Sequence, residues 1–144
     1  MGASMMKAIV LTTLIGVAAP AAAGGLRVVF TNLRTDRGAV LAELFAGEDG
    51  FPVDASRAVA QAACPIRGHE AICQFASLPR GSYALAAFHD ENGNGVLDTN
   101  LLHIPKEGTA FSRDARGHLG PARYRDASFD FTGEPLELRI RVVY

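Results

Sequence analysis

The chain has 144 residues, of which 49% are hydrophobic, and its formal net charge is −1. A length of this order suits one domain built around one hydrophobic core. The nearly neutral charge, without a basic stripe, argues against nucleic acid as a partner.

The first 23 residues follow the pattern of a secretory signal peptide. Lys7 precedes an apolar run from Ala8 to Ala19, and Ala21-Ala22-Ala23 supplies a small-residue cleavage site. The run is shorter than the roughly 20 apolar residues of a membrane span, so no transmembrane segment is expected after cleavage. We therefore predict a signal peptide over 1–23, one domain over 24–144, and a periplasmic or secreted location. An uncleaved anchor is the alternative.

Alternating hydrophobic runs between turn residues predict a strand-rich domain. Runs at 26–32 and 39–46 predict an N-terminal hairpin, and Asp54 is placed to cap a short helix that extends to about Gln61. Further strands are expected at 63–66, 71–75, 83–89, 126–132 and 136–144. About seven short strands with this spacing favour an all-β fold, an immunoglobulin- or transthyretin-like β-sandwich with one short helix and a long loop.

The two cysteines of the chain, Cys64 and Cys73, lie symmetrically about Gly68-His69. A turn at this pair would place the two side chains opposite each other across a hairpin, within disulfide reach. In an oxidising compartment, two such cysteines indicate one disulfide bond. A zinc site would need further ligands in a recognisable motif.

Oxygen-bearing side chains recur from residue 90 to residue 98 in the pattern D-x-N-x-N-G-x-x-D. This spacing matches the first three quarters of a calcium loop of the EF-hand type. Gly95 stands where such a loop needs a positive φ. The expected ligands are the side chains of Asp90, Asn92, Asn94 and Asp98 and the backbone carbonyl of Val96, whose own side chain would turn into the core.

The last ligand of such a loop is missing, because Leu101 occupies the position of the bidentate acid. Glu107 is the next acid, and it would reach the site only through a longer excursion of the chain. Two formal charges predict weak calcium affinity, toward the millimolar class. The alternative is a metal-free turn in which the Asp and Asn side chains accept hydrogen bonds from loop amides.

The segment from Thr99 to Arg125 has little periodicity, and irregular segments of this length are often functional. Its basic residues suit an anionic glycan, a phosphate or a protein partner, or a simple solvated loop. These residues are Arg113, Arg116, Arg123 and Arg125.

Two kinds of site chemistry have weaker support. His89, His103 and His118 would suit zinc or copper if they gathered beside a carboxylate, but their spacing matches no metal motif. Ser112, Asp114 and His118 contain the residue types of a hydrolytic triad, but no G-x-S-x-G elbow surrounds the serine.

Several segments resemble an uncharacterised bacterial secreted family, domain-of-unknown-function family 2141. The run from Tyr83 to Asn100 resembles its signature, as do the Ile104 to Gly108 segment, the Gly50-Phe51-Pro52 loop and the Leu78 to Gly81 turn. The resemblance extends over residues 26–144 and implies an immunoglobulin- or transthyretin-like β-sandwich without an established activity. The loop is also similar to the calcium-binding loops in the B-repeats of bacterial surface adhesins.

These patterns predict a secreted, non-enzymatic β-sandwich module that binds a protein or glycan partner in the envelope, with or without calcium at 90–98. The alternative is a small-ligand carrier or hydrolase-like protein with its site in the 99–125 segment. A deep pocket with converging polar groups between the 90–98 loop and residues 103–118 would favour the alternative, and a shallow surface the module.

Overall fold

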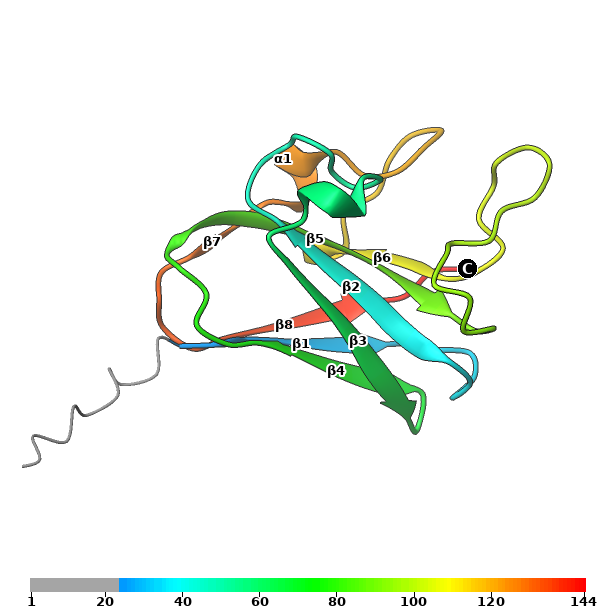
Figure 1. Cartoon of the computed structure of the whole chain (residues 1–144), viewed down its shortest axis with the longest axis horizontal. Coiled ribbons are helices and arrows are strands. Elements are labelled where there is room, and N and C mark those ends of the chain that lie inside the picture. Colours follow the sequence, from blue (N-terminus) through cyan, green and yellow to red (C-terminus); the bar gives the residue numbers. More distant parts are fainter. Residues whose placement is uncertain (1–23) are drawn as a thin grey trace, which may run out of the picture.

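Eight β-strands form the body of the computed structural model, which describes residues 24–144 (Figure 1). The predicted signal peptide at 1–23 lies outside the described residues. Within residues 24–144, no helix is long and apolar enough to span a membrane. The strands are β1 Leu26–Thr31, β2 Ala39–Phe45, β3 Ala60–Arg67, β4 Glu70–Phe75, β5 Gly81–Asp90, β6 Thr109–Phe111, β7 Phe129–Phe131 and β8 Leu136–Arg141.

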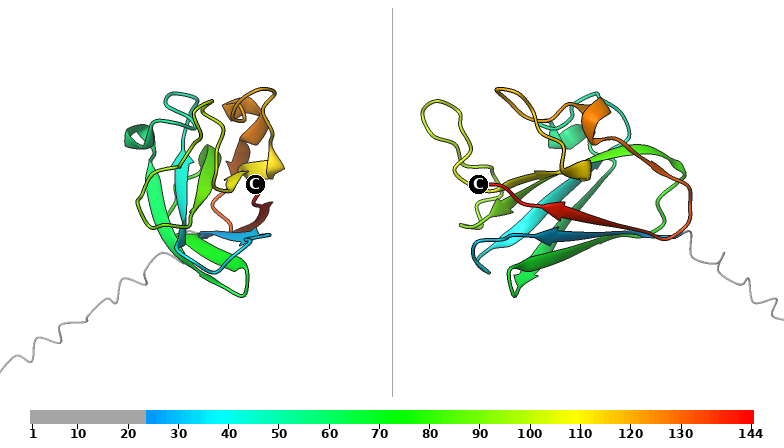
Figure 2. Two further views of the ribbon diagram at one scale, coloured as in Figure 1. Left: turned by 90° about the vertical axis from the view of Figure 1, so that its right-hand side faces the viewer. Right: turned by 180° about the vertical axis from the view of Figure 1, so that it is seen from behind.

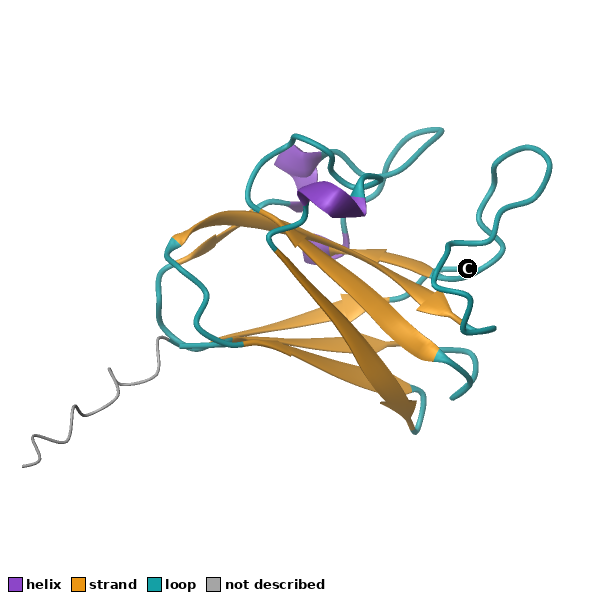
Figure 3. Ribbon diagram, viewed as in Figure 1, coloured by secondary structure: helices purple, strands orange, loops and turns teal. Residues whose placement is uncertain are grey.

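The strands follow one hydrogen-bonded path, β6-β5-β2-β3-β4-β1-β8, with β7 paired to β5. Figure 3 shows the strands in orange and the loops that connect them in teal. The path has two halves, β6-β5-β2 and β4-β1-β8, and β3 joins them. Most of β3 pairs with β2, while only Ile66 and Arg67 pair with β4. The path nearly closes where Thr109 of β6 exchanges two backbone hydrogen bonds with Val143, at 2.8 and 2.9 Å. The predicted all-β class is confirmed, but a sandwich of two separate sheets is not; the sheet is barrel-like instead (Figure 2).

The predicted N-terminal hairpin is wrong. β1 pairs antiparallel with β4 and parallel with β8, whereas β2 pairs with β3 and β5. The connection between them is anchored to other parts of the chain: the Asn32 side chain donates to the Val142 carbonyl (2.8 Å), and the Leu33 N–H donates to the His69 carbonyl (3.2 Å). These bonds lead the chain away from β1 before β2 begins.

The predicted helix at 54–61 is only a single 3₁₀ turn, η1 (Ala55–Arg57). Asp54 caps it as expected, with Oδ1 accepting from the Ser56 N–H at 3.1 Å. The following residues alternate between inward and outward positions from Ala60 onward and join β3, because so short a helix has little stability of its own. The 99–125 segment also has more structure than predicted, since it contains β6, η2 (Ser112–Asp114) and the start of α1 (Tyr124–Ala127).

β5 is the longest strand and lies second from one end of the hydrogen-bonded path. Its residues from Tyr83 to Ala87 are all buried, and the strand pairs with β2, β6 and β7. The core beside it contains large side chains from both halves of the sheet, which are fully buried. They include Phe30, Leu44, Leu85, Phe131 and Ile140.

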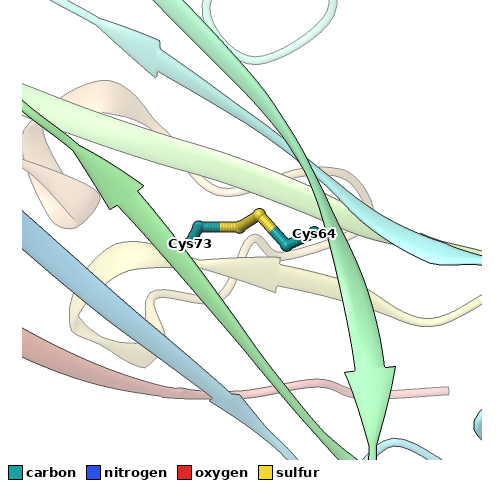
Figure 4. The surroundings of a disulfide bond; sticks show 2 residues. All are labelled: Cys64 and Cys73. Atoms are coloured by element: carbon teal, nitrogen blue, oxygen red, sulfur yellow. A yellow bond between two sulfur atoms is a disulfide. The ribbon is translucent and has the colours of Figure 1, made fainter.

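Cys64 of β3 and Cys73 of β4 form the predicted disulfide, with their Cα atoms 5.6 Å apart (Figure 4). The hairpin turns at Gly68-His69, as the symmetry of the two cysteines predicts. Cys64 is paired with Val40 of β2 and Cys73 with Val28 of β1. The disulfide therefore ties the two halves of the sheet together where the β3–β4 hairpin opens.

Candidate functional site

The loop after β5 closes around the carboxylate of Asp90. This side chain is buried, and its two oxygens accept from the backbone N–H groups of Asn94 (3.2 Å) and Gly95 (2.9 Å). Gly95 has a φ of 76°, a left-handed value that glycine adopts without steric cost. The loop therefore turns back onto Asp90, as the spacing of its oxygen-bearing residues predicts.

Asp98 connects the other predicted ligands. Its carboxylate oxygens accept from the side-chain amides of Asn92 (2.6 Å) and Asn94 (3.0 Å). The Asn92 Oδ1 accepts from the Asn94 N–H at 3.2 Å, and the Asn94 Oδ1 accepts from the Val96 N–H at 3.0 Å. The four predicted side-chain ligands thus lie in one hydrogen-bonded network, and its Asx turns are those of the metal-free alternative.

Glu107 adds a third carboxylate to the loop. It is buried, and its two oxygens accept from the backbone N–H groups of Glu91 (3.0 Å) and Asp98 (3.1 Å). A hairpin returns it to this position, with a bridge between Thr99 and Pro105 and a 2.8 Å bond from the Lys106 N–H to the Asp98 carbonyl. This hairpin is the longer excursion that the sequence requires of Glu107.

One detail of the predicted calcium site is wrong: the Val96 side chain is 62% exposed and does not enter the core. The Asx turn at Asn94 holds Val96 outward in the loop. Among residues 24–144, no three His, Cys, Asp or Glu side chains are grouped as a metal site. An ion in this loop would therefore have to use amide and carbonyl oxygens as well as carboxylates.

Of the four carboxylates in and beside the loop, only Glu91 forms an ion pair with a cationic side chain of the described residues. Asp90, Asp98 and Glu107 form no ion pair with any Lys, Arg or His of the described chain. Glu91 differs, because Arg34 donates to it through Nη2 at 3.1 Å and forms an ion pair with it. The Arg34 guanidinium also lies over the Tyr144 ring, 4.4 Å from its centroid. The three other carboxylates are left with N–H donors alone.

The hydrogen bond from Arg34 lowers the pKa of Glu91 below its ordinary value of 4.5. A carboxylate with a lowered pKa in the folded state stabilises the fold above its unfolded pKa, and this contribution is lost as the pH falls through the folded pKa. We therefore expect the melting temperature of the wild type to fall more steeply than that of Glu91→Gln between about pH 5 and pH 3. Thermal melts over this range measure it, with Glu48→Gln as the exposed control; equal slopes for the wild type and Glu91→Gln would contradict the assignment.

An open pocket of about 420 Å³ lies beside the loop. Most of the side chains that line it are exposed, so it is a surface depression and not a deep, enclosed site. This shape favours the module over the carrier or hydrolase. Its lining residues are Arg34, Arg37, Glu91, Asn92, Asp98, Thr99, Lys106 and Glu107.

Several residues considered for a histidine metal site or a hydrolytic triad form hydrogen bonds that hold the fold together. His89 is buried, with Nδ1 2.7 Å from the Tyr144 hydroxyl and Nε2 2.7 Å from the Arg37 carbonyl. The Ser112 Oγ accepts from the Leu85 N–H (2.9 Å) and donates to the Ala127 carbonyl (2.5 Å). The Asp114 carboxylate accepts from the Arg141 N–H at 2.8 Å. These contacts favour neither the histidine metal site nor the triad.

Sequence reasoning missed Arg34 and Tyr144, which shape the charge beside the loop. Both are far from it along the chain, so no local spacing could have indicated them. Gly38 lies in the turn between β1 and β2, where a side chain would collide with the Asp90 carbonyl. Its positive φ of 71° lets the backbone of the 34–38 turn lie against the start of the loop.

The structure is thus that of a small all-β domain with a carboxylate-rich loop after β5. A family model described as an uncharacterised protein conserved in bacteria (DUF2141) matches residues 28–139. The chain therefore belongs to this family, as the resemblance of the sequence predicts. No curated protein and no solved structure matches the chain significantly.

Proposed function

We propose that this protein is a non-enzymatic binding module of the periplasm or the extracellular space, and that calcium binds weakly in its 90–98 loop. The observation that carries the proposal is the set of carboxylates at Asp90, Asp98 and Glu107, which have N–H donors but no cationic side chain as partners. A divalent cation would supply the direct ionic partner that these three carboxylates lack.

The proposed ligands are the oxygens of Asp90, Asn92, Asn94 and Asp98 with the carbonyl of Val96. The side-chain amide groups of Asn92 and Asn94 now donate to Asp98, so an ion would have to replace these two bonds and draw the amide oxygens inward. This exchange is a cost of binding and fits the weak affinity that the loop composition predicts.

Thermal melts in chelator and in millimolar calcium test the calcium part of the proposal. At calcium concentrations ten times Kd, the wild type should gain about 1.4 kcal/mol of unfolding free energy, or about 5 °C in melting temperature. Asp98→Asn should lose most of this gain, because it removes one of the two charged ligands. The Asp98 carboxylate accepts its hydrogen bonds within the loop from the side chains of Asn92 and Asn94, not from the backbone. Asn92→Ala should lose less, since a neutral oxygen contributes less.

Asp130→Asn is the matched control, because it removes the same charge from an exposed position on β7. It should keep the full calcium response. If the wild type responds no more than Asp98→Asn, the loop is a metal-free turn and the calcium proposal fails.

A further inference from the structure

Two loops project from the same side of the molecule (Figures 1 and 2). Large apolar side chains are exposed on both loops. The first, at residues 99–106, follows the 90–98 loop; the second, at residues 116–121, lies between η2 and α1. We call them the tip loops. Leu101 is 99% exposed, Leu102 76% and Ile104 54% in the first, and Leu119 is 110% exposed in the second. These side chains project from convex tips, which makes them unlike the lining of a small-molecule pocket.

The first tip loop and residues 115–125 carry cations and no carboxylate, whereas Asp98 and Glu107 lie at the base of the first loop. Residues 99–106 and 115–125 contain no Asp or Glu, whereas Lys106, Arg116 and Arg123 lie within these segments. None of these three cations forms an ion pair with a described residue. Exposed leucines at a tip, with unpaired cations beside them, are complementary to an anionic lipid surface, where the apolar groups enter the interface and the cations meet phosphate groups.

The backbone of the first tip loop has internal hydrogen bonds that suit it to transfer from water into a lipid interface. The Asn100 Oδ1 accepts from the N–H groups of Leu102 (2.8 Å) and Ile104 (3.0 Å), and the Asn100 carbonyl accepts from the His103 N–H (3.0 Å). The Asn100 N–H in turn donates to the Ile104 carbonyl at 2.9 Å. These internal bonds lower the cost of placing the leucines in an apolar environment, where an unpaired amide is expensive.

We infer that the two tip loops dock this domain onto an anionic membrane surface, with Leu101, Leu102 and Leu119 entering the lipid interface. Membrane docking by the tip loops does not depend on calcium binding in the 90–98 loop, so an experiment can refute either proposal without refuting the other. The tip loops are exposed throughout, which leaves the fold independent of the substitutions that test them.

Sedimentation with vesicles in the presence of chelator tests the docking. The wild type should pellet with vesicles containing about one-third phosphatidylglycerol in phosphatidylcholine, and less at high salt. The triple variant L101S/L102S/L119S should bind at least about tenfold more weakly, because it loses the inserted apolar groups. K106Q/R116Q should also lose about tenfold, and binding of the wild type to pure phosphatidylcholine should be weak.

Single tryptophans locate the contact, because the chain contains none. The emission of L101W and L119W should shift to the blue when the anionic vesicles are added. I72W on β4, where Ile72 is 43% exposed, is the matched control and should not shift.

Three results would overturn the inference: a wild type that stays in the supernatant with vesicles, a triple serine variant that pellets like the wild type, or equal shifts for I72W and L101W. A concentration-dependent shift of L101W without vesicles, together with dimers in analytical ultracentrifugation, would instead assign the tips to self-association.

Discussion

Glu107→Ala is expected to lower the free energy of unfolding by about 2–3 kcal/mol, which is about 8–12 °C in melting temperature for a domain of this size. The Glu107 side chain is buried and accepts from the backbone N–H groups of Glu91 and Asp98. Alanine would leave both donors without their acceptor and would detach the 99–105 hairpin from the base of the loop.

Glu107→Gln should lose less, because its amide oxygen still accepts one of the two bonds. Denaturant unfolding of both variants measures the difference, and Glu48→Ala is the control at an exposed position. If Glu107→Ala were as stable as Glu48→Ala, Glu107 would not be the anchor of the loop.

Removing the disulfide is expected to cost a similar amount, about 2–3 kcal/mol, in the double variant Cys64→Ala/Cys73→Ala. The closed segment is short, and the entropy of loop closure grows only with the logarithm of its length. The bond joins strands from the two halves of the sheet, so its loss also weakens the contact between β3 and β4, where the backbone pairs only at Ile66 and Arg67.

Chemical unfolding of the double variant and of the reduced wild type should give the same loss, since both lack the same cross-link. A loss below about 0.5 kcal/mol in both would mean that the hairpin needs no cross-link, in conflict with the predicted role.

Local patterns in the sequence predicted most of the strands and the disulfide, but not β6 or the start of β3. Alternating residues locate β1, β5 and β8 because a strand places successive side chains on opposite faces. The symmetry of Cys64 and Cys73 about Gly68-His69 predicts their hairpin because each antiparallel pair lies at equal distance from the turn. In the same way, the two-residue spacing of Asp90, Asn92 and Asn94 predicts a loop that turns toward one carboxylate.

The choice of strand partners could not be predicted in this way. A two-residue period fixes which face of β1 is buried, but it contains no information about whether β1 pairs with β2 or with β4 and β8. The deciding contacts lie far apart in the chain, such as Asn32 with Val142. The barrel-like closure depends on similar contacts, because it requires β3 to pair with strands on both sides.

The candidate site also combines local features, which the sequence predicts, with contacts between distant residues, which it does not. The sequence predicted that Asp90, Asn92, Asn94 and Asp98 come together, because they are neighbours in one short segment. The position of Glu107 could not be derived, because it depends on a hairpin whose turn is held by the Asn100 side chain. Val96 was expected inside the core because its side chain is apolar, but the hydrogen bond from its N–H to Asn94 fixes it outward.

A calorimetric titration of residues 24–144 with calcium, after removal of all metal by chelation, tests the central proposal most directly. Because the loop offers only two of its carboxylates as predicted ligands, saturable binding with Kd in the millimolar range is expected, and Asp98→Asn should weaken it strongly. Magnesium should bind less well, because it demands a tighter octahedral set of oxygens. The absence of saturable binding and of any rise in melting temperature up to about ten millimolar calcium would contradict the proposal and leave residues 90–98 a metal-free turn.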